Sequence, residues 1–395
     1  MSSRSGGRAV LGAFAAVAMF PPAACGGGPT SSGTAPDTGG DGAFPVTIEH
    51  KYGSTTIPAK PQRVVTLGYT DQDAVIALGT VPVGTSEWYG DQPGALFPWA
   101  AEKLGGAPLP TVLPVSQTVD FERVAALAPD LILALYAGLE QGDYEKLSAI
   151  APTVVPPAGV PNYGIPWDTQ TEIVGTALGK PAEAAVLVKE VKDKIAEVKA
   201  AHPEYAGKTA LVANQFSDQW YAYSTEDQRG RLLTELGFTV NPEIDALAGG
   251  QFSTPISFER ADLIDADALI WVMFDSEQEP KVRANPSYAA TRAAKEGRDV
   301  FVVPTGSTGL EPMIGFLTVL SLPPLLDALP AHLDALLDGD VTGLRSYGAR
   351  FAGVVYPGET LRANVWKEGD GYVGVVTVPE RNNEVVLSGV ELVPA

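Results

Sequence analysis

The stretch VDFERVAALAPDLILAL, residues 119–135, reappears in altered form as ISFERADLIDADALIWV, residues 256–272. Each copy begins with a residue suited to cap a helix, Asp120 in one and Ser257 in the other, followed by the same three residues, Phe-Glu-Arg. A short helix, a break at an acidic residue and a buried apolar strand follow in both copies. The repeat therefore predicts two lobes of similar topology.

Strands and helices alternate within each half, which is the pattern of an α/β layer fold with a mostly parallel sheet. The sequence predicts three strands on each side of a central helical region. The candidates are Arg63–Leu67, Val81–Thr85 and Leu131–Leu135 in the first half, and Lys208–Ala213, Leu269–Met273 and Val300–Val303 in the second.

The region between the halves has a helical period. Val188, Val191, Ile195 and Val198 lie three or four residues apart, with Lys and Glu on the other face. This pattern predicts a helix from about Pro181 to Ala201, roughly 30 Å long, which is enough to bridge two lobes. Before it, residues 169–172 (Thr-Gln-Thr-Glu) fit a capping box.

The composition narrows the function. Of 395 residues, 47 are acidic and 27 are basic, giving a formal charge of −20. This balance argues against a nucleic-acid partner, because phosphate contacts need a surplus of Lys and Arg. One Cys and three His, which are His50, His202 and His332, are too few and too scattered for a zinc finger or a direct transition-metal site.

The N-terminus is typical of an export signal over residues 1–24. A basic start precedes an uncharged apolar stretch from Ala9 to Phe20, and small residues then lead to Cys25. This stretch is too short to span a bilayer as a helix. Residues 25–43 are rich in Gly, Ser and Thr without an apolar period, and they predict a flexible tether.

These features together resemble a known family. The opening KPQRVVTLGYTDQDAVIALGTVPVG, residues 60–84, both Phe-Glu-Arg segments and the bridging helix are similar to substrate-binding proteins of bacterial ABC importers for ferric siderophores, haem and cobalamin. The resemblance covers about residues 44–336. It implies a class III periplasmic binding protein, in which two Rossmann-like lobes joined by a long helix hold ligand in the cleft between them. The expected parts are an N-terminal lobe (44–168), a bridging helix (169–202) and a C-terminal lobe (203–336).

The N-terminal segment also resembles a bacterial lipoprotein signal, although Pro22 stands where that motif usually has Leu. The resemblance implies that Cys25 is lipidated and anchors an extracytoplasmic protein to the cell membrane.

Aromatic residues follow nearly every predicted strand, although they make up only 8% of the chain. In open α/β sheets ligands bind beyond the carboxyl ends of the strands. A shallow cleft lined by aromatic faces suits a bulky, partly apolar chelate or macrocycle, although any one ring could instead pack under a loop. We expect Arg229 and Arg231 to be solvated on a helix surface. The candidate ligand-binding residues are Tyr69, Trp88, Tyr89, Tyr136, Phe216, Trp220, Phe252, Phe274 and Thr308.

Glu122 and Glu259 occupy equivalent places in the two copies of the repeat. A carboxylate in the first turn of a helix stabilises the helix dipole by about 0.3–1 kcal/mol. The family resemblance implies a second role, in which one such glutamate per lobe docks onto arginines of a dimeric membrane permease. Both roles are compatible.

The tail, residues 337–395, has a different pattern, with strand-like runs separated at residues 369–371 and 381–383. It is expected to form a small β-meander, and it resembles the last strands of a MaoC-type (hot-dog) enoyl-CoA hydratase. The hydratase's Asp-x4-His motif is absent, and no His follows His332. We therefore expect an accessory segment without catalysis.

The prediction is a monomeric, lipid-anchored receptor that captures an Fe(III)-siderophore chelate and delivers it to an ABC permease dimer, with no resident cofactor, no metal site and no catalytic residues. The nearest alternative is the same architecture carrying haem or cobalamin, for which Tyr69, Tyr89 or Tyr136 could supply an axial ligand to haem. An enzyme, either a hydratase through the tail or a hydrolase, is the alternative from another class. The sequence has no G-x-S-x-G elbow and no P-loop.

Overall fold

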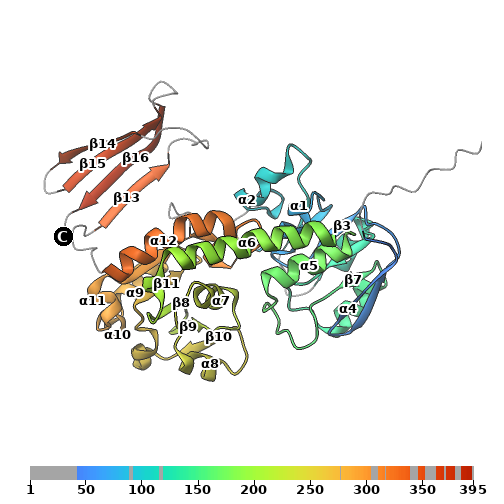
Figure 1. Ribbon diagram of the computed structural model, residues 1–395, viewed down its shortest axis with the longest axis horizontal. Coiled ribbons are helices and arrows are strands. Elements are labelled where there is room, and N and C mark those ends of the chain that lie inside the picture. Colours follow the sequence, from blue (N-terminus) through green and yellow to red (C-terminus); the bar gives the residue numbers. More distant parts are fainter. Residues whose placement is uncertain are drawn as a thin grey trace, which may run out of the picture. The chain divides into compact units, whose positions relative to one another are not determined.

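The computed structural model describes residues 42–88, 92–114, 119–275, 277–303, 310–315, 317–338, 346–351, 362–368, 371–378 and 384–393 (Figure 1). The predicted export signal, Cys25 and the tether as far as residue 41 lie outside the described residues. Among the helices of the described ranges, none combines the length and the apolar character needed to cross a membrane.

The N-terminal lobe contains a parallel sheet in the order β5-β4-β3-β6-β7. All three predicted strands are present. The second begins at Gly84, later than predicted, because Pro82 has no N–H to donate to a neighbouring strand. The strands are β3 (Val64–Thr66), β4 (Gly84–Ser86), β5 (Thr111–Leu113), β6 (Leu131–Leu133) and β7 (Thr153–Val154), preceded by the antiparallel hairpin β1 (Val46–His50) and β2 (Gly53–Ile57).

Short helices connect these strands, as expected for parallel pairs, and α5 follows the last of them. They are α1 (Asp71–Ala77), η1 (Pro93–Ala95), α2 (Pro98–Ala101), η2 (Glu102–Leu104), α3 (Phe121–Ala126), α4 (Gln141–Ser148) and α5 (Trp167–Ala177), where η marks a 3₁₀ helix.

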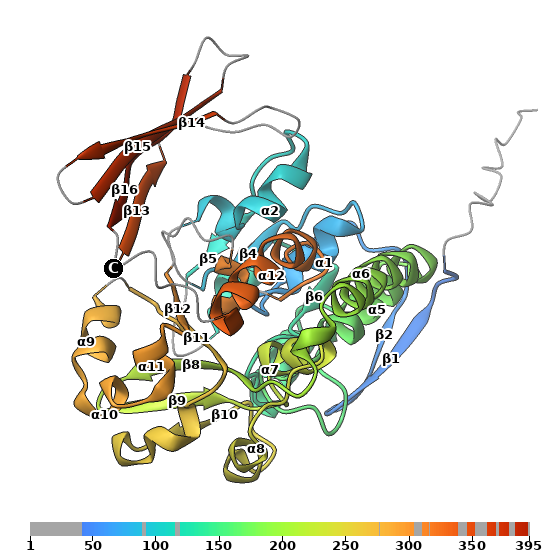
Figure 2. The same ribbon diagram turned by 60° about the vertical axis from the view of Figure 1, so that its left-hand side comes forward.

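The C-terminal lobe contains a mixed sheet in the order β10-β9-β8-β11-β12 (Figure 2). Its three predicted strands, β8 (Ala210–Phe216), β11 (Ala268–Val272) and β12 (Asp299–Val302), are parallel, and β9 (Gln219–Tyr223) and β10 (Ser253–Ile256) add an antiparallel edge. The helices are η3 (Pro203–Tyr205), α7 (Gln228–Glu235), α8 (Pro242–Ala248), η4 (Phe258–Ile264), α9 (Gln278–Ala284), α10 (Pro286–Ala289), α11 (Arg292–Glu296), η5 (Glu311–Ile314) and α12 (Leu322–Asp338).

The predicted bridging helix is confirmed as α6 (Pro181–Ala201) (Figure 1). It buries Ala184, Val188, Val191 and Ile195 in a core that includes side chains from both lobes, and it packs on α5 and α12. Each large apolar side chain buried in this way stabilises the fold by about 1.5–3 kcal/mol. The predicted capping box is wrong, because Pro166 precedes the first turn of α5 and residue 169 lies inside the helix.

The repeat places equivalent strands in both lobes. Each of the strands β6 and β11 that follow the Phe-Glu-Arg segments lies between the first parallel strand of its lobe and the last. Asp120 caps α3 by accepting the amide of Arg123 at 3.0 Å, and the Ser257 hydroxyl accepts the amide of Glu259 at 3.3 Å. The second helix is 3₁₀ where the first is α. Two lobes of like topology are therefore confirmed.

The tail contains a separate antiparallel sheet in the order β13-β16-β15-β14. The predicted hairpins are present between β14 (Arg362–Glu368), β15 (Gly371–Val378) and β16 (Glu384–Val393). β13 (Ser346–Phe351) pairs with β16, so the sheet is a three-stranded meander with a fourth strand beside its last one.

Candidate functional site

Three aromatic rings form a continuous stack beyond the carboxyl ends of the N-terminal strands. Tyr69 follows β3, and its ring lies nearly parallel to the rings of Trp88 and Tyr163, with centroids 5.3 and 5.9 Å away. Tyr136, beyond β6, meets Tyr163 edge-on at 5.8 Å. Tyr69, Trp88 and Tyr163 are half-buried, so the stack offers ring surface at the edge where α/β proteins bind ligands.

Tyr163 is a member of this stack that the sequence reasoning missed. It follows β7, a strand of only two residues, which has too short an apolar run to be recognised. The neighbouring residues Asn162 and Gly164 favour a turn and were the sequence signal that could have located it. Tyr163 itself lies in this turn with a positive φ of 59°.

Trp88 also contacts the other lobe. A Cβ atom on Gly315, which follows η5, would clash with the indole of Trp88. The backbone of Gly315 has a φ of 149°, so a side chain there would be strained as well as obstructed. Only glycine lets the chain of the C-terminal lobe lie directly against the indole ring.

A pocket of about 170 Å³ lies beside the stack, lined by described residues of the N-terminal lobe only. Tyr69 and Tyr163 form part of its wall, and Glu87, Asp120 and Asp143 add carboxyl groups. Pockets that enclose a whole small-molecule ligand are usually about 300–1,000 Å³. This pocket is therefore of a size to accept one arm of a larger ligand.

Arg229 is buried, and the prediction that it is solvated is wrong. Its Nε and Nη2 donate to the two carboxylate oxygens of Asp227 at 2.7 and 2.8 Å, and its guanidinium lies 3.5 Å from the centroid of the Tyr223 ring. Nη1 donates to the carbonyl oxygen of Ile314 at 3.2 Å, next to Gly315. The pair thus holds the segment that contacts Trp88. Helix periodicity could not reveal this cluster, because the partners of Arg229 come from a helix cap, from β9 and from the distant helix η5.

Charge and burial fix the protonation of this cluster. Burial alone would lower the pKa of Arg229, but the adjacent carboxylate of Asp227 raises it, so the guanidinium stays charged. Burial, reinforced by the Asp227 carboxylate, raises the pKa of the Tyr136 phenol. Tyr136 is therefore a neutral hydrogen-bonding group near neutral pH.

Arg231 is only partly exposed, and it is also held by the protein. Its Nη1 donates to the carbonyl oxygen of Gly164 at 3.0 Å, and its Nη2 lies 3.3 Å from Glu226.

The other predicted ligand residues differ in where the structure places them. The prediction for Trp220 is wrong: its side chain is fully buried among Phe258, Trp271 and Tyr288, because β9 returns antiparallel and turns residue 220 into the core. Phe216 and Phe274 are 64% and 41% exposed, and Phe252 packs partly against the core. Tyr89 and Thr308 lie outside the described residues.

Glu122 and Glu259 are both exposed. In each copy the neighbouring Phe packs against a core, and the neighbouring Arg forms ion pairs with nearby acids, such as Arg123 with Asp120 at 3.1 Å. The glutamates are left directed toward solvent, which is compatible with a docking role.

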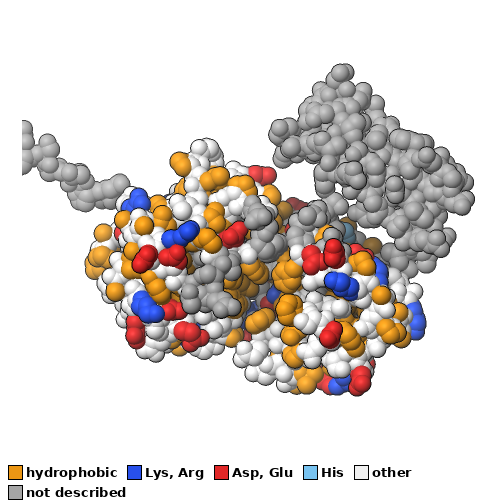
Figure 3. All heavy atoms as spheres, turned by 180° about the vertical axis from the view of Figure 1, so that it is seen from behind, with side chains coloured by type: hydrophobic (Ala, Val, Ile, Leu, Met, Phe, Trp, Pro, Cys, Tyr) orange, Lys and Arg blue, Asp and Glu red, His pale blue; other side chains and the backbone are white. Residues whose placement is uncertain are grey.

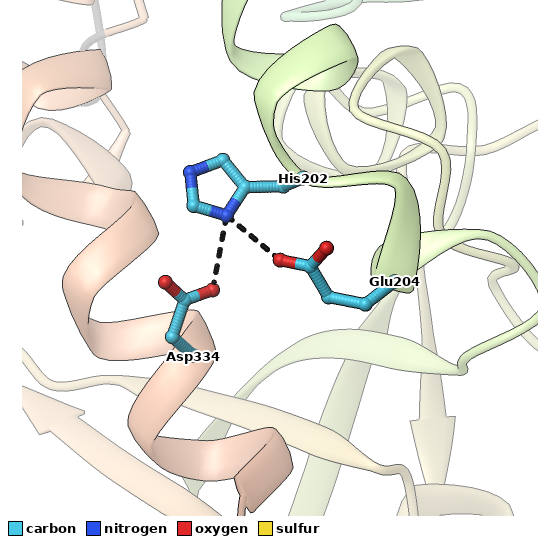
Figure 4. A group of neighbouring side chains, drawn as sticks. All are labelled: His202, Glu204 and Asp334. Atoms are coloured by element: carbon cyan, nitrogen blue, oxygen red, sulfur yellow. Dashed lines mark hydrogen bonds and ion pairs between the residues drawn. The ribbon is translucent and has the colours of Figure 1, made fainter.

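One cluster among the described residues contains several potential metal ligands, His202, Glu204 and Asp334 (Figure 4). The Nδ1 atom of His202 lies 2.9 Å from Glu204 and 3.2 Å from Asp334, and Tyr205 donates its hydroxyl to Asp334 at 2.9 Å. These bonds join the end of α6 to α12. We interpret the cluster as a structural tie between the two helices, formed by side chains from distant parts of the sequence.

With this geometry established, comparison with known proteins identifies the family. The model of the periplasmic binding protein family matches residues 64–304. The chain belongs to this family. A solved periplasmic solute-binding protein from Mycobacterium smegmatis is 36% identical, with a TM-score of 0.65 over 74% of this chain and 98% of that one. The ferric-anguibactin-binding protein of Vibrio anguillarum is 29% identical over 268 residues, which are 65% of this chain and 80% of the relative. The class III fold predicted from the sequence is confirmed.

The tail has a different relative. A C-terminal stretch of 65 residues, 16% of this chain, is 66% identical to an enoyl-CoA hydratase of Mycobacterium tuberculosis. The match spans only 23% of the hydratase. The predicted resemblance of the tail to this class of hydratase is confirmed, and it extends to less than a quarter of such an enzyme.

Proposed function

We propose that this extracytoplasmic periplasmic binding protein captures a ferric siderophore between its lobes and passes it to an ABC-type importer. The observation that carries the proposal is the stack of Tyr69, Trp88 and Tyr163 at the carboxyl ends of the parallel strands. Flat aromatic faces suit a bulky, partly apolar chelate. The relative from Vibrio anguillarum is named as a ferric-anguibactin-binding protein, and this name supports the same class of cargo.

The iron in this proposal is cargo that arrives already chelated. Trp88 and Tyr69 would contact the organic part of the chelate, and the adjoining pocket would accept one of its arms. Phe216, Phe252 and Phe274 remain candidates for the opposite wall. The binding step involves no covalent chemistry, and we propose no catalytic role for the hydratase-like tail, which spans a small part of that enzyme.

Delivery would use one exposed glutamate from each lobe, Glu122 and Glu259, to dock onto a permease dimer. Lipidation of Cys25 would keep the protein at the membrane where that dimer resides.

Titration calorimetry with a panel of ferric chelates, haem and cobalamin tests the binding step. We expect saturable binding of a ferric siderophore, weakened at least about tenfold by Tyr69→Ala, since stacking contacts of this kind contribute about 0.5–1.5 kcal/mol beyond the area they bury. Glu190→Gln, an exposed position on α6, is the matched control. If only haem or cobalamin binds saturably, the cargo belongs to that class instead. If no ligand of the panel binds, the proposal is excluded.

An uptake assay tests delivery separately. Glu122→Ala combined with Glu259→Ala is expected to abolish uptake while leaving chelate affinity unchanged. Equal loss of affinity and uptake would mean that these glutamates act in the binding site instead.

A further inference from the structure

The segments that follow the parallel strands contain acidic residues and no basic ones. After β3, β4, β5, β6 and β7 the chain runs through residues 67–70, 87–97, 114–120, 134–140 and 155–166, with four acids and no Lys or Arg. These four acids are Glu87, Asp91, Asp120 and Glu140, of which Asp91 lies outside the described residues. After β11 and β12, residues 273–277 and 303–321 likewise contain only acids, which are Asp275, Glu277 and Glu311.

This depletion is local. Lys and Arg side chains occur on both lobes elsewhere, interspersed with acidic and apolar ones (Figure 3). The lack of Lys and Arg in the segments after the strands is therefore not explained by the acidic composition of the whole chain. These segments follow the strand ends, where the ligand is proposed to bind.

Two arginines of α7 that reach these segments already have carboxylate partners. Arg229 has a bidentate partner in Asp227, and its remaining donor is directed to the carbonyl oxygen of Ile314. Arg231 is held by Gly164 and Glu226. Lys51 donates to the neutral side chain of Asn162 at 3.0 Å and lies 4.9 Å from the ring of Tyr52, and burial lowers its pKa while the nearby acid Glu140 acts to raise it.

At the pocket beside the stack, the same pairing leaves an acidic surplus. Arg123 pairs with Asp120, and Lys146 pairs with Asp143, whereas Glu87 has no basic partner among the described ion pairs. An anionic ligand placed here would meet neutralised guanidinium groups and an unmatched carboxylate. Desolvating such a ligand without a countercharge is costly.

We infer that the chelate bound by this protein is neutral or cationic, as in ferric complexes of hydroxamates, and that anionic catecholate or citrate-type complexes are rejected. In a trishydroxamate complex the charges of the three ligand groups balance the ferric ion, so no countercharge is required from the protein. A terminal amine on the chelate would add an attraction to the acidic segments. This inference rests on the proposed function and specifies the chemical class of its cargo.

A series with one iron centre and three charges tests the inference. The probes are the ferric complex of a linear trishydroxamate with a free terminal amine, its N-acetyl derivative and its N-succinyl derivative, measured by titration calorimetry on the full chain. We expect the amine and acetyl forms to bind at least about tenfold more tightly than the succinyl form at low salt, with the difference shrinking as salt screens the charges. A ferric tricatecholate and ferric citrate are included as anionic chelates.

Two variants locate the effect. Glu87→Gln is expected to reduce the preference for the amine form over the succinyl form severalfold, and Glu87→Lys to reduce it further. Glu190→Gln, on the exposed side of α6, should leave the preference unchanged.

The outcomes separate the two proposals. If the succinyl form binds as tightly as the amine form, or if only the tricatecholate or citrate complex binds, the charge inference is overturned and the receptor function stands. If no ferric chelate of any class binds, the proposed function fails and the inference fails with it.

Discussion

The two lobes use aromatic residues in opposite ways. In the N-terminal lobe all five strands of the sheet run parallel, and Tyr69, Trp88 and Tyr163 follow strand ends and remain half-buried at one edge. In the C-terminal lobe the antiparallel β9 turns Trp220 inward, where it packs with Trp271 in the core. Strand direction, more than aromatic content, decides whether a ring becomes part of a binding wall or of a core.

The largest expected effect comes from the buried ion pair of Asp227 and Arg229 in the C-terminal lobe. Asp227→Ala should lower the free energy of unfolding by about 3–5 kcal/mol, because it leaves the guanidinium of Arg229 buried without a countercharge. Urea unfolding measures this loss. Glu226→Ala, which removes the half-exposed partner of Arg231, is the matched control and should cost less than about 1 kcal/mol. Equal losses in both variants would contradict the structural role of the buried pair.

The contact between Gly315 and Trp88 gives the next effect. Gly315→Ala should weaken chelate binding by at least about tenfold, or about 1.4 kcal/mol, because the new methyl group displaces the indole from the stack. Gly250→Ala is the matched control. Gly250 also has a positive φ, of 85°, but nothing lies within 4 Å of a Cβ atom there, so the substitution adds backbone strain without a clash. If calorimetry shows an equal loss of chelate affinity in both variants, the contact between Gly315 and Trp88 is not required for binding.

The contrast between Trp88 and Trp220 can be sharpened directly. Trp220→Phe should reduce stability by about 1–3 kcal/mol with little change in affinity, because it leaves a void in a packed core. Trp88→Phe should weaken binding severalfold and leave the unfolding midpoint nearly unchanged. Urea unfolding and calorimetry of both variants test this contrast. If Trp220→Phe lowers the affinity and Trp88→Phe lowers the stability, Trp220 belongs to the binding site after all.

The last effect depends on pH and concerns a hydrogen bond between α1 and the segment before α12. Burial raises the pKa of Asp73 to about 6, although its carboxylate accepts bonds from Thr318 at 2.7 Å and Trp99 at 2.8 Å. The folded-state pKa lies above the unfolded one, near 3.8, so the stability from the protonated form is present at low pH and lost as pH rises through about 6.

Asp73→Asn should therefore gain stability relative to the natural chain as pH rises from about 4 to 7, by at most about 3 kcal/mol, and keep a constant advantage above pH 7. Thermal unfolding across this pH range measures the difference. A difference that does not change with pH would show that Asp73 ionises in the folded chain as easily as in water.

The architecture was largely predictable because it depends on local patterns. The repeat, the period of α6 and the apolar runs of β6 and β11 are all contained in short windows of sequence. The antiparallel edge was missed, because strand direction depends on pairing with distant residues. The same limit applies to the site: Tyr69 and Trp88 could be inferred from strand ends, whereas the Arg229 pair and the Gly315 contact depend on segments brought together only by folding.

The tail sheet has a consequence for the order in which the molecule can form. β16, which follows all other strands in sequence, lies inside the sheet between β13 and β15. Its pairing with β13 joins residues as distant as Ser346 and Val393. During synthesis the sheets of both lobes are complete in sequence by β12, whereas the tail sheet must wait for its last strand to emerge. Because this central strand is the last to be synthesised, the tail sheet should be the last of the sheets to form.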